Sequence, residues 1–233
     1  MGETSVETLA SLFATSEVTI RKDLAALEDN GLVLRRFGGA ILMPAETPEQ
    51  SERVSSRKKS IGKKAAQLIQ DHARIVIDSG TTVGAMVPFL KGKRGLVVMT
   101  NSIATAQELM ELEPEPTVLV TGGTWDTQSQ SLQGTMAEKM VASYNFDYAF
   151  VGATGMDLER GTTTFNELTQ LTRSMAEASQ QVVLMAESEK FSRKMPNVEL
   201  PWQGISTLIT DTELASETKT MLMEQDIEVI TTL

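Results

Sequence analysis

The chain contains no cysteine, which excludes disulfides, thiolate metal sites and a cysteine nucleophile. Its one histidine, His72, has no second histidine with which to form a metal centre, so we expect neither a metal site nor a cofactor. No apolar run is long enough to span a membrane, and no apolar segment of the kind found in secretion signals follows the N-terminus. These absences favour a cytoplasmic protein without a membrane partner.

Acidic residues outnumber basic ones by 31 to 21, which gives a net charge of −10. The excess is unevenly distributed, because residues 1–64 carry ten Lys or Arg and nine Asp or Glu, whereas the remainder carries eleven and twenty-two. The weakly basic part can dock onto a polyanion, while the acidic body opposes loose binding to random DNA. One such part binds DNA weakly, so we expect a homo-oligomer that places two or more copies on each DNA site.

The segment between residues 5 and 42 predicts two short helices followed by a two-stranded hairpin. Apolar residues recur at helical spacing after two N-cap residues, Ser5 and Ser16; they are Leu9, Leu12 and Phe13, then Ile20, Leu24 and Leu27. Asn30-Gly31 ends the second helix, and a hairpin with a basic strand follows, with Gly38-Gly39 at its turn. This order is typical of a winged helix-turn-helix, although a helical pair with a solvated hairpin has the same pattern.

In a helix-turn-helix, the second helix enters the major groove with its N-terminal end first. Its early polar side chains then meet base edges and phosphates, and a basic wing contacts the phosphate backbone. The candidate DNA-binding residues are therefore Ser5, Ser16, Thr19, Arg21, Lys22, Arg35 and Arg36.

Composition divides the chain into three parts. We expect the winged helix-turn-helix over residues 1–43, a linker over 44–55 and a second domain over 56–233, because the linker is rich in Pro, Glu and Ser and lacks apolar periodicity. A basic helix follows over residues 56–71, with Ile61 and Ala65 on its apolar face. Its basic side chains face solvent, DNA or the acidic body.

Short apolar runs then alternate with helical patterns. Strands are expected at 74–78, 96–99, 117–120, 148–151, 181–185, 207–210 and 228–230, and helices at 82–90, 102–112, 136–144, 168–179 and 213–224. This alternation predicts an α/β domain with a mostly parallel sheet covered by helices on both faces.

Parallel sheets of this kind bind ligands at the carboxyl ends of their strands. Hydroxyls, amides and glycines dominate the residues at these ends, and they suit a phosphate, although ordinary helix caps use the same residue types. Lys190 adds a positive charge, and Asp78 and Glu167 can accept hydrogen bonds from sugar hydroxyls. No Gly-x-Gly-x-x-Gly follows a strand, so a sugar or polyol phosphate fits better than a dinucleotide. The candidate effector-binding residues are Asp78, Ser79, Gly80, Thr81, Thr82, Asn101, Ser102, Gly122, Gly152, Glu167 and Lys190.

These motifs resemble the DeoR family of bacterial transcriptional repressors over nearly the whole chain. The similar residues are Thr19-Ile20-Arg21-Lys22-Asp23-Leu24, Gly38-Gly39, Asp78-Ser79-Gly80-Thr81-Thr82, Thr100-Asn101-Ser102, Gly122-Gly123-Thr124 and Lys190-Phe191. The resemblance implies a winged helix-turn-helix, lacking the helix that the family has before Ser5, and a Rossmann-like sensor domain similar to ribose-5-phosphate isomerase. It also implies a repressor of a sugar or polyol catabolic operon that binds operator DNA. Its effector would be a phosphorylated sugar or polyol, with glucitol 6-phosphate favoured.

The alternative is an enzyme, a sugar-phosphate isomerase on the same scaffold. Isomerisation needs a positioned base beside a carbonyl, and Glu167 can serve as one. The similar isomerases, however, carry carboxylates in the loop where this chain has Gly152-Ala153-Thr154-Gly155. We therefore expect no catalytic residues and a sensor rather than an enzyme.

Overall fold

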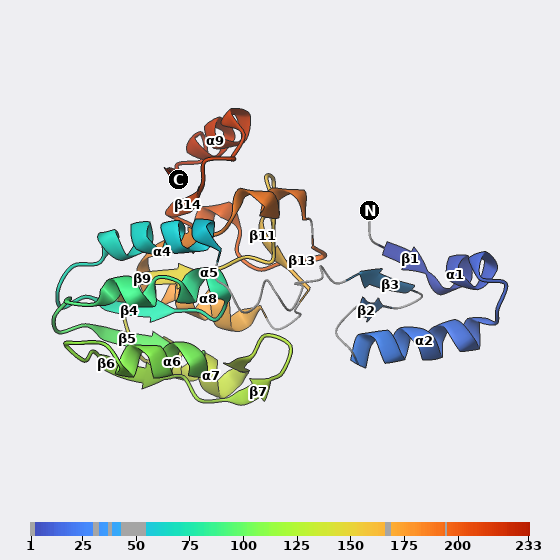
Figure 1. Ribbon diagram of the computed structural model, residues 1–233, viewed down its shortest axis with the longest axis horizontal. Coiled ribbons are helices and arrows are strands. Elements are labelled where there is room, and N and C mark those ends of the chain that lie inside the picture. Colours follow the sequence, from blue (N-terminus) through green and yellow to red (C-terminus); the bar gives the residue numbers. More distant parts are fainter. Residues whose placement is uncertain (1–2, 30–32, 37–38, 43–54, 166–168, 194) are drawn as a thin grey trace. The chain divides into compact units, whose positions relative to one another are not determined.

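The computed structural model describes residues 3–29, 33–36, 39–42, 55–165, 169–193 and 195–233 (Figure 1). Contacts divide the chain into two units, Met1–Glu52 and Arg53–Leu233. The expected domain limits at 1–43, 44–55 and 56–233 stay a prediction, because only Ser55 of the expected linker is described.

The first unit contains two helices and a small sheet. Helices α1 (Val6–Leu12) and α2 (Glu17–Asp29) precede strands β2 (Val33–Arg36) and β3 (Gly39–Leu42), as the sequence predicts. A further strand, β1 (Glu3–Ser5), pairs with β3, so the antiparallel sheet has the order β1-β3-β2 rather than two strands. Sequence analysis missed β1 because it has only three residues and ends on the cap of α1. The expected helix end at Asn30-Gly31 lies outside the described residues.

The core of this unit is small, with Val6, Ile20, Leu24, Val33 and Ala40 buried. Three of the apolar residues at helical spacing are not buried in this core, namely Leu12, Phe13 and Leu27, which are 72%, 66% and 38% exposed.

The second unit contains, within the residues described, a sheet of seven strands in which every neighbouring pair is parallel. The order is β15-β14-β12-β9-β4-β5-β6, so the direction of strand addition reverses between β4 and β9. The expected parallel α/β fold is thereby confirmed. The strands are β4 (Arg74–Ile77), β5 (Val97–Thr100), β6 (Thr117–Val120), β9 (Phe146–Val151), β12 (Ser179–Met185), β14 (Thr207–Asp211) and β15 (Glu228–Thr232).

Two small antiparallel sheets extend from this one and were not expected. Their strands are β7 (Thr124–Asp126) with β8 (Ser131–Gln133), and β10 (Gly155–Asp157) with β11 (Gly161–Thr164) and β13 (Asn197–Val198). Two short 3₁₀ helices lie in the C-terminal part, η2 (Ser188–Ser192) and η3 (Trp202–Gly204).

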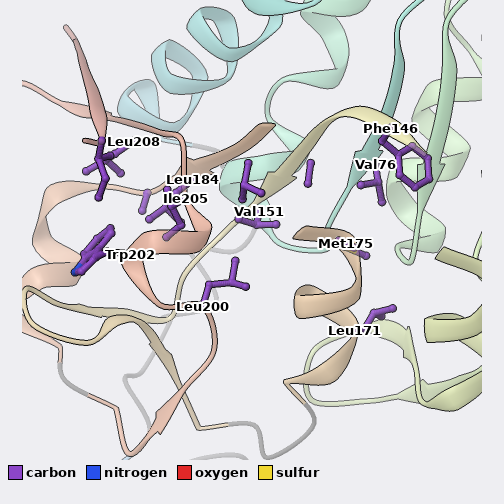
Figure 2. Packing of buried hydrophobic residues seen from close by; sticks show 14 of the residues in the cluster. Val76, Phe146, Val151, Leu171, Met175, Leu184, Leu200, Trp202, Ile205 and Leu208 are labelled. Carbon is purple, nitrogen blue, oxygen red and sulfur yellow. The ribbon is translucent and has the colours of Figure 1, made fainter. Parts of the chain in front are cut away.

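Helices cover both faces of the large sheet, and successive strand residues enter different cores: Val76 lies in one, and Ile75 and Ile77 lie in the other. One face is covered by α4 (Ser56–Leu68), α5 (Thr81–Gly84), η1 (Val87–Leu90) and α6 (Ile103–Met110). The other face, shown in Figure 2, is covered by α7 (Thr135–Ala142), α8 (Gln170–Glu177) and α9 (Ser216–Met223). None of the helices in the described ranges is long and apolar enough to cross a membrane.

The expected single helix over 82–90 is wrong, because the structure has the short helix α5 and then the 3₁₀ helix η1. Pro88 lies in the first turn of η1. Proline has no N–H to donate to the preceding turn and disfavours the α conformation at the residue before it, so an α-helix does not continue through this position.

Helix α4 lies unusually close to the chain that leaves α5. A Cβ atom on Gly62 would lie 2.6 Å from both the carbonyl carbon and oxygen of Ala85, and 2.7 Å from the nitrogen of Met86. Only a residue without a side chain allows this backbone contact, which holds the start of α4 beside the loop after β4.

We therefore expect Gly62→Ala to destabilise the second unit by about 1–3 kcal/mol, because the two backbone segments must separate. Gly204→Ala is the matched control, since a Cβ atom there would have no heavy atom within 4 Å in the described structure. Urea unfolding of both variants measures the difference, and equal stabilities would contradict the close contact.

Candidate effector and DNA-binding sites

The reversal of strand order brings several predicted residues together at the carboxyl edge of the sheet. Asp78 follows β4, and its backbone N–H donates to the carbonyl oxygen of Phe150 in β9 (2.9 Å). Asn101 follows β5, and its Nδ2 donates to Asp78 Oδ1 (3.1 Å). Gly152 follows β9 and lies against α5, since its Cβ atom would be 3.3 Å from Val83 Cγ2. These loops thus form a continuous edge at the position where open α/β sheets bind ligands.

Asp78 is a buried carboxyl at the centre of this edge. Burial raises its pKa to about 6, against the opposing effect of hydrogen bonds from the Ser79 N–H (2.8 Å) and from Asn101. Asn101 itself is fully buried, and its Oδ1 has no hydrogen-bond partner in the described structure. Buried acceptors are normally hydrogen-bonded, and a ligand hydroxyl can donate the missing hydrogen bond to Asn101 Oδ1.

Glu199 is a second carboxyl at this edge, and sequence analysis did not select it. Burial and then the nearby charge of Asp78 raise the pKa of Glu199 to about 7. Thr172 Oγ1 donates to Glu199 Oε1 (2.9 Å), and Arg173 Nε donates to the Glu199 backbone oxygen (2.9 Å). Glu199 follows β13 rather than a strand of the large sheet, so inspection of strand ends could not find it.

The loop from Ser79 to Thr82 provides the groups that suit a phosphate. Gly80 has a φ of +121°, and a Cβ atom there would meet no heavy atom within 4 Å among the described residues. Thr81 Oγ1 accepts a hydrogen bond from Lys58 Nζ (2.8 Å). The loop therefore combines open space and hydroxyls with a lysine from α4, which sequence analysis assigned only to a basic helix face.

The other predicted effector residues lie in several different elements. Ser102 caps α6, because its Oγ accepts from the Thr105 N–H (3.2 Å). Gly122 is exposed after β6 and has a φ of +66°, and Lys190 lies in η2, after β12. Glu167 lies outside the described residues. Trp202 packs in the core, and its Nε1 donates to the Asp157 backbone oxygen (2.9 Å).

The described structure has two hollows, and the second is lined by Val198 and Leu200, the two chain neighbours of Glu199. One of about 330 Å³ is lined by Asp147 and His72 at the amino ends of the strands, and one of about 430 Å³ is lined by Arg173 and Gly204. Neither contains a predicted effector residue, so we base the candidate site on the chemistry of the strand-end loops.

The predicted DNA-binding residues of the helices lie at the start of α1 and α2. Both serines are helix caps: Ser5 Oγ accepts from the Thr8 N–H (3.0 Å), and Ser16 Oγ accepts from the Thr19 N–H (3.1 Å). Thr19, Arg21 and Lys22 are exposed on the first turns of α2. Arg21 forms an ion pair with Glu17 one turn earlier (2.6 Å). Arg35 and Arg36 belong to β2, where they pair with Ala40 and Gly39 of β3.

Fold and sites together define a class of protein, namely a regulator that joins a winged helix-turn-helix to a Rossmann-like sensor. Residues 1–45 match the family described as the DeoR-like helix-turn-helix domain, and residues 53–212 match the DeoR C terminal sensor domain. The chain therefore belongs to the DeoR family, and it is a DNA-binding transcriptional repressor rather than an enzyme.

Sequence similarity to known regulators extends over nearly the full length of this chain. A protein of Escherichia coli O157:H7, named as an aga operon transcriptional repressor, is 35% identical over 98% of this chain and 88% of its own length. The regulator GolR of Listeria innocua is 31% identical over 90% of this chain and 85% of its own. These names do not support the alternative of an isomerase.

Solved structures with a similar fold include ribose 5-phosphate isomerase A from Neisseria gonorrhoeae. It is 17% identical with a TM-score of 0.41, and the match covers 57% of this chain and about half, 52%, of the isomerase. A translation initiation factor eIF-2B from Pyrococcus horikoshii is 17% identical with a TM-score of 0.47, covering 69% of this chain and 64% of that one. These likenesses concern the fold alone.

The two raised pKa values predict a pH dependence of stability. Between about pH 4 and pH 7 the folded protein binds more protons than the unfolded chain, because the pKa is raised to about 6 at Asp78 and to about 7 at Glu199. The free energy of unfolding therefore falls as the pH rises through this range. The double variant Asp78→Asn, Glu199→Gln should lose less stability over this range, by roughly 3–6 kcal/mol.

Urea unfolding at a series of pH values measures this effect. Glu177→Gln is the control, because Glu177 is an exposed carboxyl on the same helix as Thr172 and its variant should follow the unmodified protein. The same decline in the double variant and the unmodified protein would contradict the assignment.

Proposed function

We propose that this repressor controls a sugar or polyol catabolic operon, and that a phosphorylated sugar or polyol bound at the strand-end loops releases it from its operator. The observation that carries the proposal is the arrangement around Asp78. Hydroxyls and a lysine lie at one end of its loop, and buried acceptors lie at the other. A phosphate suits the first group, and the hydroxyls of a polyol suit the second.

Glucitol 6-phosphate is our favoured effector. Within the family, residues 161–167 and the segment from Lys190 to Val198 look most like the glucitol operon repressor. A phosphosugar without a free carbonyl also suits a site that uses its carboxyls as hydrogen-bond acceptors rather than as bases. Other sugar phosphates share this chemistry, and their ranking by thermal shift identifies the effector, since a ligand of the folded state raises the melting temperature.

Operator recognition is proposed for the exposed residues at the start of α2, assisted by the basic strand β2. The first unit, residues 1–52, carries four Lys or Arg against nine Asp or Glu, a net charge of −5, so one copy binds the polyanionic operator weakly. We therefore propose a homo-oligomer that presents two or more DNA-binding units to repeated operator sites. The effector stabilises an arrangement of the sensor units that no longer matches this spacing.

Replacing Thr81 and Thr82 together by Val should abolish release from the operator by glucitol 6-phosphate, because the phosphate loses two hydroxyl donors. The readout is the anisotropy of labelled operator DNA titrated with glucitol 6-phosphate and, as the control ligand, with glucitol. Operator affinity measured without ligand checks that the variant folds. An unchanged response would refute the assignment of this loop to the phosphate.

Arg21→Ala should weaken operator binding by about tenfold and should lower the slope of log affinity against log salt by about one. The exposed ion pair with Glu17 stabilises the free protein little, so DNA can take its place. Arg94→Ala, which removes a positive charge from the second unit, is the matched control and should leave both quantities unchanged. If the two variants bind alike, Arg21 does not contact the operator.

A further inference from the structure

The beginning of α4 is attached to the carboxyl edge of the sheet by its side chains. Lys58 Nζ donates to Thr81 Oγ1 in the loop after β4 (2.8 Å). The contact joins residues 23 positions apart, and the close backbone approach at Gly62 makes it possible. Lys58 is only half-buried, so the ammonium group can turn towards a ligand on this loop.

Two neighbouring side chains make different contacts. Ser55 Oγ donates to Glu187 Oε1 in the loop after β12 (3.0 Å), and Arg57 forms an ion pair with Glu213 after β14. Both of these partners are carboxylates, whereas the partner of Lys58 is a neutral hydroxyl. Of the two cations, Arg57 has its charge paired with Glu213. The described contact of Lys58 leaves its positive charge available to an anion.

The opposite end of the same loop has the complementary chemistry. Asn101 Oδ1 is a buried acceptor without a partner in the part of the chain that the structure describes, and Asn101 Nδ2 is held by Asp78. A ligand in this site therefore meets a cation and hydroxyls at one end, and the unsatisfied Asn101 Oδ1 beside the Asp78 carboxyl at the other. A molecule with a phosphate on one carbon and hydroxyls on the rest fits this polarity in one direction only.

We propose that Lys58 binds the phosphate of the effector, with the phosphate at Ser79 to Thr82 and the hydroxyls towards Asp78 and Asn101. This inference rests on the proposed function and names a residue of the same site. It also identifies the helix on which effector binding first acts. This helix, α4, is the first of the second unit and follows the chain that comes from the DNA-binding unit. The phosphate acts on this helix without an intermediate element.

The test compares Lys58→Gln, Lys58→Arg and Lys59→Gln in the full chain. Lys59 is the next residue on α4, it is exposed, and its substitution removes the same charge from the same helix turn. Calorimetry with glucitol 6-phosphate, with glucitol and with inorganic phosphate gives the affinities. We expect Lys58→Gln to weaken binding of glucitol 6-phosphate about 10- to 100-fold, Lys58→Arg to restore much of it, and Lys59→Gln to leave it within about twofold.

Hydrogen exchange gives a second readout that does not depend on a variant. In the unmodified protein, glucitol 6-phosphate should increase the protection of amides in the first turn of α4, and glucitol should not.

The outcomes separate the two proposals. Equal binding by Lys58→Gln and Lys59→Gln, with the unmodified protein responding to glucitol 6-phosphate or another phosphosugar, overturns the role of Lys58 and leaves the proposed function intact. A protein that binds none of the phosphosugars tested overturns the proposed function and this inference with it.

Discussion

The pairing of β4 with β9 is the constraint on which the candidate effector site depends. From β4 to β6 each new strand adds to one edge of the sheet, and from β9 to β15 each adds to the other. The connections therefore diverge at β4 and β9, and the loops that follow these two strands remain uncovered. The hydrogen bond from the Asp78 N–H to Phe150 lies at this divergence, so the backbone pairing itself sets the position of the central carboxyl.

The second constraint is electrostatic. Folding buries Asp78 and places Glu199 near enough for the charge of one to raise the pKa of the other. Burying a carboxylate disfavours the folded state unless hydrogen bonds compensate, and each acid has only part of what it can accept. A parallel sheet needs no acid at this position for its own stability. The unfavourable arrangement is reasonable if a ligand with several hydroxyl donors completes it, which is why perturbed carboxyls point to binding sites as well as to catalytic ones.

Much of this molecule could be predicted from its sequence, and the exceptions have physical causes. The central strands of the large sheet are visible as apolar runs because both of their faces are buried, and the edge strands β6 and β15 keep apolar residues although they are only partly buried. Strand β11 was missed because it is made of Gly and Thr. Its Thr162 and Thr163 are nevertheless fully buried, and their hydroxyls accept the backbone N–H groups of Leu200 and Met195. Sequence patterns detect apolar burial and do not detect burial of a satisfied hydroxyl.

The candidate site divides in the same way. Asp78 and Asn101 were found because they directly follow strands of the large sheet, and topology brings such residues together. Lys58 and Glu199 reach the same edge from α4 and from β13, and their positions depend on packing. For Lys58 the decisive residue is Gly62, whose missing side chain lets two backbones touch. A contact of this kind has no periodic signature in the sequence.

The net charge of the DNA-binding unit, −5 over residues 1–52, bears on the proposed control by an effector. Arg21, exposed at the start of α2, already has Glu17 as a partner, so in the proposed interface DNA competes with an ion pair that is itself weak because both side chains are exposed. In the proposed homo-oligomer, one unit contributes little affinity, and two units held at the operator spacing contribute through their effective concentration. A coupling free energy of roughly 1–3 kcal/mol at the sensor changes the affinity about 5- to 150-fold. Under this proposal, tight binding by each unit alone would make the repressor insensitive to the arrangement of its copies, and an effector that acts on that arrangement could not release it.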